Sequence, residues 1–363
     1  MKPDSNAPLP GSGNGSGLNP DAPAFQPDRL LLIRLSSMGD VLLATPVVRM
    51  IRKRFPETRI DVAVKKQFAP LWEGNPHING IRTLDSSGIG SLIRLIRTVR
   101  AGRYDAVVDL HGHWRTRMLT FFSGASIRLR YRADRWTRFH LVHFHRNRYQ
   151  TVRPVPIKYL DALAPLGVQD DGGGLELALD SKEIERADAL LAGIGGDPRE
   201  WIALAPGARW PTKRWPVESF AELGRRLEAK GYGVLILGGK DDRSVCESVA
   251  AGLAKPVVVR GEPIRSSTAL LSRSRLVIAN DTGLMHAACA VGTPIVALFG
   301  PTTRHLGFFP FRARAAIVEK PIACRPCSYH GSKRCPQKHF LCMRSITAGE
   351  VFEKVQSLLE IKS

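Results

Sequence analysis

The sequence predicts an α/β protein made of two Rossmann-like, doubly wound parallel-sheet domains that face a central cleft. Short apolar runs, typical of strands buried in a parallel sheet, alternate with amphipathic segments of helical length along most of the chain. This alternation stops at a polar, glycine-rich break over residues 167–174 and then starts again. Many of the apolar runs end in loops rich in Gly, Ser, Asn, Asp and Thr, and such loops bind ligands at the carboxyl edge of open sheets.

Length and composition agree with this architecture. The chain has 363 residues, enough for two domains with separate cores, and its 44% hydrophobic and 24% charged residues are typical of globular proteins. No run approaches the roughly 18 apolar residues of a membrane-spanning helix. Residues 1–28 are rich in Pro, Gly, Ser and Asn and lack an apolar core, so they are predicted to be a disordered tail and not a signal peptide. A cytoplasmic protein is therefore expected.

The N-terminal domain is assigned to residues 29–170. Apolar runs predict its strands, at 29–35, 59–64, 78–84, 104–110 and 127–131. Segments with one apolar face predict its helices, at 40–54, 89–100, 114–122 and 157–166. Pro46 is expected either near the first turn of the 40–54 helix or as a mild kink within it. The Arg- and His-rich stretch 132–153 shows no clean period and is interpreted as loops with short helical pieces.

The C-terminal domain is assigned to residues 171–345, and the remaining segment 346–363 to a C-terminal helix, centred on 348–361. Apolar runs predict the strands of this domain, at 201–205, 233–237, 256–260, 276–279 and 295–299, with helices between them. Four of these strands end in loops suited to ligands, at 206–208, 238–241, 280–283 and 300–302. Because the strands are expected to be parallel, these four loops should share one edge of the domain.

The charge indicates an anionic partner. The formal net charge is +20, and residues 91–160 hold 14 arginines and one lysine against three acidic residues. Nucleic acid, an anionic membrane face and a phosphorylated substrate would each account for this excess. The sequence shows neither an RNP-like pattern nor a helix-turn-helix pattern, so nucleic acid is the least favoured of the three.

One complete βαβ unit, residues 275–302, is the segment best suited to bind phosphate. Its first strand runs into Asn280-Asp281-Thr282-Gly283, which matches the entrance of a helix. The free N–H groups and positive end of that helix would suit a phosphate. An ordinary strand, cap and helix without a ligand would have the same sequence pattern, so the segment alone does not decide.

Two further positions allow both a structural and a functional interpretation. Asp40 follows the first strand, where an acidic residue usually caps a helix, but where a carboxylate also lies at the carboxyl edge of the sheet and could accept a proton from a hydroxyl. Lys213 and Arg214 lie between two Trp-Pro corners and could contact a diphosphate as point charge and fork, or form a solvated basic turn.

Four motifs in order give the sequence a family resemblance. They are Ser36-Ser37-Met38-Gly39-Asp40-Val41-Leu42, Lys213-Arg214-Trp215-Pro216, Asp281-Thr282-Gly283-Leu284-Met285-His286 and Leu298-Phe299-Gly300-Pro301-Thr302. From about Arg29 to the C-terminus, the chain resembles the ADP-heptose:lipopolysaccharide heptosyltransferases, glycosyltransferase family nine. The resemblance implies the GT-B architecture, inversion at the anomeric carbon, and no need for a divalent metal.

The resemblance also implies roles for individual residues. Asp40 is similar to the catalytic base, and Ser37 and Gly39 would shape its loop on the acceptor side. The implied donor-binding residues are Lys213 for the diphosphate, Asp281 for the heptose hydroxyls, Thr282, Gly283 and Leu284 near the phosphates, His286 in the same helix, and Asp241 or Asp242 for the ribose. The implied acceptor-binding residues are His111, Arg115 and Arg117.

The implied activity is transfer of heptose from ADP-L-glycero-D-manno-heptose to a lipopolysaccharide inner-core acceptor. The expected partners are this donor, a lipid A–Kdo or core oligosaccharide acceptor, and peripheral contact with the inner face of the inner membrane, with no nucleic acid. A GT-B transferase that uses another nucleotide sugar for the cell envelope remains an alternative, as does, less favoured, a basic nucleic-acid-binding protein.

The C-terminal cysteines leave a separate question open. Cys324, Cys327, Cys335 and Cys342 cluster in sequence, but only the first pair has the tight spacing of a zinc knuckle. A disulfide is the least expected use in a reducing cytoplasm. The alternatives are a structural zinc or iron–sulfur site and thiols that bind no metal; no cofactor is expected to be required for the chemistry.

Overall fold

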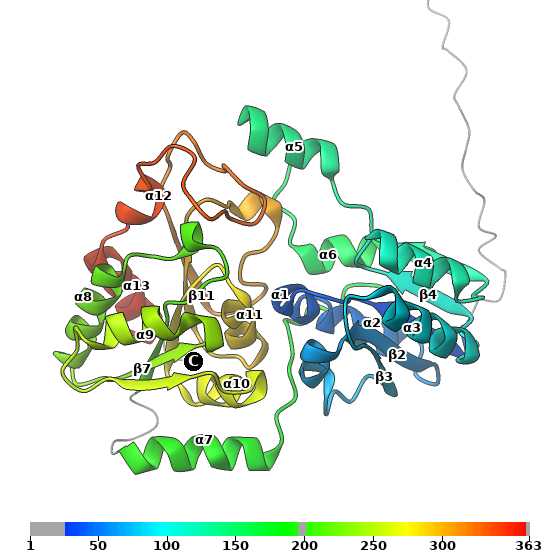
Figure 1. Ribbon diagram of the computed structural model, residues 1–363, viewed down its shortest axis with the longest axis horizontal. Coiled ribbons are helices and arrows are strands. Elements are labelled where there is room, and N and C mark those ends of the chain that lie inside the picture. The colour runs from blue at the N-terminus through cyan, green and yellow to red at the C-terminus, as the bar shows by residue number, and fades with distance from the viewer. Residues whose placement is uncertain (1–25, 195–200, 361–363) are drawn as a thin grey trace, which may run out of the picture.

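The computed structural model describes residues 26–194 and 201–360 (Figure 1). Most of the predicted disordered tail, residues 1–25 of 1–28, lies outside the described residues. The remainder of that segment takes part in the fold, because the Pro27 carbonyl accepts a hydrogen bond from the Thr58 hydroxyl at 2.6 Å and the Asp28 carbonyl accepts one from the Arg59 N–H at 2.8 Å. Among the described residues, no helix combines the length and the apolar character needed to cross a membrane.

The first domain contains a wholly parallel five-stranded sheet in the order β3-β2-β1-β4-β5. Its strands are β1 (Arg29–Ile33), β2 (Arg59–Lys65), β3 (Gly80–Leu84), β4 (Ala106–Asp109) and β5 (Ile127–Arg130). Its helices are α1 (Met38–Leu42), α2 (Thr45–Arg54), η1 (Lys66–Trp72), α3 (Ile89–Ala101), α4 (Trp114–Phe122), α5 (Arg135–Phe144), α6 (Val155–Leu160) and η2 (Asp161–Leu166). The central strands β1 and β4 are apolar and buried on both faces because helices cover both sides of the sheet.

The second domain contains a parallel six-stranded sheet in the order β11-β10-β9-β6-β7-β8. Its strands are β6 (Trp201–Ala205), β7 (Gly233–Gly238), β8 (Val257–Arg260), β9 (Leu276–Asn280), β10 (Ile295–Phe299) and β11 (Ala315–Glu319). The edge strand β11 was not predicted. Its sequence is short and its side chains are mostly half-buried, so it lacks the long apolar run that reveals a central strand.

Helices cover both faces of this second sheet, so strands and helices alternate as predicted. They are α7 (Ser181–Ile194), η4 (Pro211–Lys213), α8 (Val217–Glu228), η5 (Lys240–Asp242), α9 (Arg243–Ala250), α10 (Ile264–Arg273), α11 (Gly283–Ala290), η6 (Arg304–Leu306), α12 (Leu341–Arg344) and α13 (Ala348–Glu360). Of these, α10 packs on α7 and α13 packs on α8 (Figure 1). The two-domain α/β prediction is confirmed.

One prediction about helices was wrong, and another was incomplete. The single helix expected over 40–54 is two helices, α1 and α2, which meet at Leu43 and Ala44, and Pro46 lies in the first turn of α2, where its missing N–H has no intrahelical partner to lose. The stretch expected to be loops with short helical pieces, 132–153, contains the ten-residue helix α5. The helix α5 buries only Leu141 and Val142, so the pattern of one apolar face is too weak to read from the sequence.

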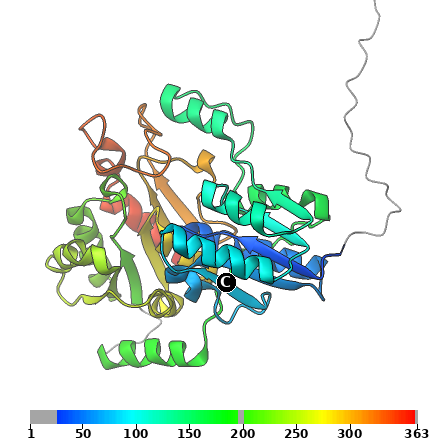
Figure 2. The same ribbon diagram turned by 45° about the vertical axis from the view of Figure 1, so that its right-hand side comes forward.

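The two domains lie side by side and meet where α1 contacts α11 (Figures 1 and 2). The helix α1 follows β1 and α11 follows β9, so the carboxyl edges of both sheets are directed at this junction. The helix α5 stands apart from the first sheet, above the junction in both views (Figures 1 and 2). This arrangement gives the molecule its GT-B architecture.

Candidate active site

The junction between the domains depends on two glycines. A Cβ atom on Gly39 of α1 would lie 2.7 Å from Cδ2 of His286 in α11, and a Cβ on Gly283 would lie 2.5 Å from the sulfur of Met38. Both distances are shorter than van der Waals contact allows, so a larger residue at either position would force the side chain of His286 or Met38 to move. Glycine at both positions therefore lets the loop that carries Asp40 lie directly against the Asp281–His286 segment.

Asp40 is both a capping residue and one half of an ion pair. Its Oδ2 accepts hydrogen bonds from the Ser37 N–H at 3.0 Å and the Ser37 hydroxyl at 2.7 Å, and its Oδ1 lies 2.5 Å from Nη2 of Arg34. Burial acts to raise the pKa of Asp40, but the Arg34 charge and the two Ser37 hydrogen bonds together hold this pKa below its ordinary value. The carboxylate is consequently ionised near neutral pH, the state that a general base needs.

Arg34 was not predicted as a site residue. Its Nη1 donates to the Leu110 carbonyl at 2.6 Å, and its guanidinium lies 5.5 Å from the centre of the Tyr159 ring, so the side chain is fixed on three sides. The available signal was an arginine at the end of an otherwise apolar strand, where a charge is only tolerated if it is paired. Arg34 thus holds the Asp40 carboxylate in its orientation.

Two histidines flank this carboxylate. Burial lowers the pKa of His111 and of His286 to about 4 in each case, so both rings are neutral near pH 7. The Nδ1 atoms of both rings are buried without a hydrogen-bond partner among the described residues. His111 was predicted on the acceptor side and His286 on the donor side, and the structure places both within electrostatic range of Asp40.

The predicted donor residues Lys213 and Asp281 are brought together. Nζ of Lys213 lies 2.6 Å from Oδ2 of Asp281 and donates to the Asp281 carbonyl at 3.1 Å. The same carboxylate accepts a hydrogen bond from the Thr302 hydroxyl at 2.7 Å. Asp281 is 6% exposed and the Lys213 side chain 14% exposed, so each keeps a small face open to the junction.

Asn280 positions the loops around this pair. Its Nδ2 donates to the Pro206 carbonyl at 2.9 Å, and its Oδ1 accepts from the Trp215 N–H at 3.0 Å. These bonds join the loop after β6, the turn that carries Lys213, and the end of β9. The indole N–H of Trp215 in turn donates to the Ile346 carbonyl at 2.9 Å, which anchors the turn to the C-terminal segment.

The remaining predicted donor residues lie at the starts of α11 and α9. Thr282 precedes α11, its hydroxyl is buried without a hydrogen-bond partner among the described residues, and the first N–H groups of α11, at Gly283 and Leu284, have no intrahelical acceptor. Asp241 lies exposed in η5, the short 3-10 helix after β7. Asp242 is instead used internally, since its carboxylate accepts from the Gly239 N–H at 3.1 Å and lies 3.5 Å from Arg214.

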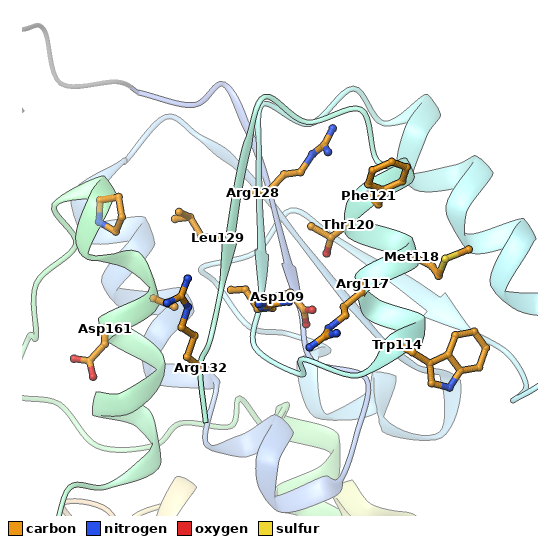
Figure 3. A pocket seen from close by; sticks show the side chains of 13 residues that line it. Asp109, Trp114, Arg117, Met118, Thr120, Phe121, Arg128, Leu129, Arg132 and Asp161 are labelled. Carbon is orange, nitrogen blue, oxygen red and sulfur yellow. The ribbon is translucent and has the colours of Figure 1, made fainter. Parts of the chain in front are cut away.

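The predicted acceptor residues Arg115 and Arg117 point in different directions. Arg115 donates to the Ser87 carbonyl at 2.8 Å, on the side of α3. Arg117 lines a cavity of about 870 Å³ between α4, β5 and η2 (Figure 3). Besides Arg117, the cavity is lined by arginines 128, 130 and 132, by the apolar side chains Trp114, Met118, Phe121 and Leu129, and by Asp109, Thr120, Asp161, Ala162 and Pro165. We call this cavity the β5 groove.

A segment that the sequence did not assign to the site, residues 320–340, lies against it. Nη2 of Arg325 donates to the Thr302 carbonyl at 2.8 Å and to Glu319 at 2.9 Å, which holds the segment beside the loop that supports Asp281. Burial, together with the charge of Arg138, lowers the pKa of His330, and Asp40, Lys213 and Asp281 are also close enough to influence it. His330 thus lies among charged groups of both domains, although its sequence context gives no signal for that position.

The four C-terminal cysteines do not form a metal site as they are arranged. In the part of the chain that the structure describes, no three His, Cys, Asp or Glu side chains converge in a way that could hold a metal ion. Cys324 Sγ lies 3.8 Å from Nε2 of His339, while Cys342 is buried in the apolar core of the second domain. Burial raises the pKa of Cys342 to about 11, so its thiol is protonated near neutral pH.

Comparison with known proteins identifies the family of the chain. Residues 92–338 match the family model described as glycosyltransferase family 9 (heptosyltransferase). Lipopolysaccharide heptosyltransferase 2 of Salmonella typhimurium is 27% identical over 91% of this chain and 98% of its own. A family 9 glycosyltransferase from Veillonella parvula superposes with a TM-score of 0.78 at 26% identity, over 92% of this chain and 97% of its own. TibC of enterotoxigenic Escherichia coli, named as an iron-containing dodecameric glycosyltransferase, shares the fold at 15% identity, with a TM-score of 0.57 over 92% and 76% of the two chains. This match covers most of the chain, including the Lys213 turn and α11 on one side of the junction. The protein therefore belongs to glycosyltransferase family 9, the heptosyltransferase family.

Proposed function

We propose that this enzyme transfers heptose from ADP-L-glycero-D-manno-heptose to a lipopolysaccharide inner-core acceptor, with inversion at the anomeric carbon. The observation that carries the proposal is the α1–α11 junction, where the loop of the ionised carboxylate Asp40 lies against the Asp281–His286 segment of the other domain, and Asp281 is paired with Lys213. A base on one side and a cation on the other is the arrangement that sugar transfer from a nucleoside diphosphate needs. The heptosyltransferase names of the family and of the Salmonella relative favour heptose as the sugar.

In the proposed reaction, the acceptor hydroxyl attacks the anomeric carbon of the donor from the side of Asp40. The carboxylate of Asp40 takes the hydroxyl proton as the new C–O bond forms, and the bond from the anomeric carbon to the diphosphate breaks with its electron pair leaving on ADP. Lys213 and the N–H groups at the start of α11 stabilise the negative charge that develops on the diphosphate. Asp281 holds the heptose hydroxyls, and Asp241 the ribose.

The transfer is proposed to need no divalent metal. A bound metal ion would stabilise the charge of the leaving diphosphate, and Lys213 with the positive end of α11 is placed to do the same. The cysteine cluster lies in a different segment, and no step of the reaction passes through it.

The acceptor is proposed to approach from the first domain. The β5 groove joins arginines to an apolar wall, which suits an anionic glycan that continues into a lipid (Figure 3). The arginines at 117, 128, 130 and 132 form no ion pair with any described residue, so their charges are available to phosphates or carboxylates. Work at the cytoplasmic face of the inner membrane, in peripheral contact with it, follows from an acceptor of this kind.

The reaction itself tests the proposal. Purified enzyme is incubated with ADP-heptose, or with UDP- and GDP-sugars, and with Kdo–lipid A or its heptosylated form as acceptor. We expect a product one heptose heavier when ADP-heptose is the donor, and none with the UDP- or GDP-sugars. NMR should show that the anomeric configuration is inverted, and the product should also form in the presence of EDTA. Transfer only from another nucleotide sugar would favour the alternative envelope transferase. Loss of transfer with EDTA, restored by a divalent ion, would contradict the metal-independent mechanism.

Membrane contact can be tested through three exposed arginines. The variant Arg128→Gln/Arg130→Gln/Arg132→Gln should bind vesicles of anionic phospholipid roughly a hundredfold more weakly, because each basic residue near such a surface contributes about 1 kcal/mol. Co-sedimentation measures the affinity. A matched variant with the same loss of charge, Arg225→Gln/Arg226→Gln/Arg243→Gln on α8 and α9, should bind like wild type. Equal affinity of all three proteins would show that the β5 groove does not face the membrane.

A further inference from the structure

A second cavity bridges the two domains above the junction. It has a volume of about 610 Å³ and is lined by Arg135, Trp136, Arg138 and Phe139 of α5 and by Tyr329 and His330 of the 320–340 segment. We call it the α5 pocket. One wall comes from each domain, so the pocket exists only when the domains are placed as they are here. None of these residues belongs to the four motifs that carry the family resemblance.

The wall from the second domain is tied to the donor side. The Ser328 hydroxyl accepts hydrogen bonds from the His330 N–H at 3.2 Å and the Gly331 N–H at 2.9 Å, which shapes the turn at Tyr329 and His330. The next residue, Ser332, donates its N–H to the Thr212 hydroxyl at 2.8 Å. Since Thr212 immediately precedes Lys213, this wall and the diphosphate-binding turn form one hydrogen-bonded unit.

The wall from the first domain presents unpaired positive charge beside aromatic rings. The Arg138 guanidinium lies 5.3 Å from the centre of the Tyr329 ring, and the His143 ring lies 5.9 Å from the same ring. Nε of Arg138 is buried without a hydrogen-bond partner among the described residues, where no carboxylate pairs with Arg138 or Arg135 either. The nearby Asp134 is already engaged by Lys158, at 3.1 Å. Trp136 remains 77% exposed, which is unusual for a tryptophan in a protein without a bound partner.

The pocket adjoins the reaction centre. His330 lines the pocket and also lies within electrostatic range of Asp40, Lys213 and Asp281. Because the wall that carries His330 is hydrogen-bonded to Thr212, a molecule in the α5 pocket would lie beside the turn that carries Lys213. The other wall, α5, belongs to the first domain, from which the acceptor is proposed to approach.

We propose that the α5 pocket binds an anionic sugar of the acceptor, next to the sugar that receives the heptose. The rings of Trp136 and Tyr329 would pack on the apolar face of the sugar ring, and Arg138, assisted by Arg135, would pair with its carboxylate or phosphate. An apolar, aromatic pocket with a few convergent polar groups is the usual form of a small-ligand site. The inference rests on the proposed function and deepens it, because it gives the second domain a part in recognising the acceptor as well as the donor.

The test compares anionic and neutralised acceptors. The probes are de-O-acylated Kdo–lipid A and its heptosylated form, each untreated, with the Kdo carboxylates as methyl esters, or with the phosphates removed. With untreated acceptor, Arg138→Gln and Tyr329→Ala should raise the acceptor KM about tenfold to a hundredfold, with kcat and ADP affinity nearly unchanged. With the acceptor that lacks the recognised anion, Arg138→Gln should have no effect, and this arm identifies the anion as carboxylate or phosphate.

The controls lie on the same helix. Phe144→Ala removes a 57% exposed aromatic ring of α5, and Arg146→Gln removes a charge just beyond it; neither residue lines the pocket, so neither should change the acceptor KM. An unchanged KM in the pocket variants, or an equal rise for untreated and neutralised acceptors, would overturn the proposal. Equal loss of vesicle binding by Trp136→Ala and Phe144→Ala, with an unchanged KM, would show instead that α5 contacts the membrane. Absence of transfer by the wild-type enzyme would contradict the proposed function itself. That outcome is distinguishable from failure of the pocket proposal, in which the wild type is active and the pocket variants keep its KM.

Discussion

Replacing Asp40 with asparagine is expected to lower kcat by about 10²-fold or more, while the affinity for ADP stays nearly the same. A positioned general base contributes about 10²–10⁴-fold and acts only in the transition state, whereas ADP is proposed to contact the other domain. The asparagine can still accept the hydrogen bonds that Ser37 donates, so the loop should keep its shape. Steady-state kinetics and calorimetry with ADP measure the two effects. Loss of ADP binding by this variant, with the fold intact, would show that Asp40 belongs to the donor site.

Arg34 makes a stability control necessary for this variant. The substitution leaves the Arg34 guanidinium without its carboxylate, and breaking a buried ion pair can lower the free energy of unfolding by about 3–5 kcal/mol. Thermal melting of Asp40→Asn therefore has to accompany the kinetics. The variant Arg34→Gln breaks the same pair but keeps the base, so it should be destabilised in a similar way and retain more turnover.

The same contacts determine the pH dependence. Because Arg34 and Ser37 lower the pKa of Asp40, the carboxylate stays ionised as the pH falls, and the acid limb of kcat should lie below the ordinary Asp value of about 3.9. His286 has a pKa of about 4 in the folded protein against 6.5 for a free side chain. The unfolded chain thus binds more protons between these values, so stability is greatest above pH 6.5 and is lost as the pH falls towards 4. Activity should then fall in this range through unfolding and not through protonation of Asp40.

The second large effect is expected at Lys213. Lys213→Ala should weaken ADP binding by at least tenfold to a hundredfold, because a hydrogen bond to a charged group contributes about 1.5–3 kcal/mol. Loss of the Lys213–Asp281 ion pair should weaken ADP binding further. Without Lys213, the carboxylate of Asp281 remains ionised beside the diphosphate and repels it, with only Thr302 as a hydrogen-bond partner among the described residues. Calorimetry with ADP measures the change.

A double variant separates these two contributions. In Lys213→Ala/Asp281→Asn the repulsive charge is gone, so part of the ADP affinity should return relative to Lys213→Ala alone. Asp281→Ala by itself should weaken binding of ADP-heptose more than binding of ADP, since its proposed partner is the sugar. If both single variants lose ADP and donor equally and the double variant recovers nothing, the pair only supports the fold of the Lys213 turn, and the diphosphate has another ligand.

Much of the fold was accessible from the sequence. Helices cover both faces of the two sheets, so the central strands are nearly continuous apolar runs. Such runs can be recognised from residue type alone. Residue type does not give the order of the strands. The edge strand β11 was not predicted and the bounds of α5 were not, because each element buries too little to leave a periodic signal. The division of 40–54 into α1 and α2 falls just before Pro46, which has no N–H to bond the Leu42 carbonyl.

The site divides in the same way. By itself, the sequence determined the family motifs, the loops at the carboxyl edges of the strands, and hence Asp40, Lys213, Asp281 and His286 as candidates. Only the tertiary structure decided which charges neutralise each other: Lys213 and Asp281 are 68 positions apart in the chain, and their 2.6 Å pair depends on how three loops meet around Asn280. The α5 pocket was beyond prediction for the same physical reason. Local sequence patterns report how much of a segment is buried. The α5 pocket has one wall from each domain, so it depends on how the two domains pack, and Gly39 and Gly283 let them approach closely.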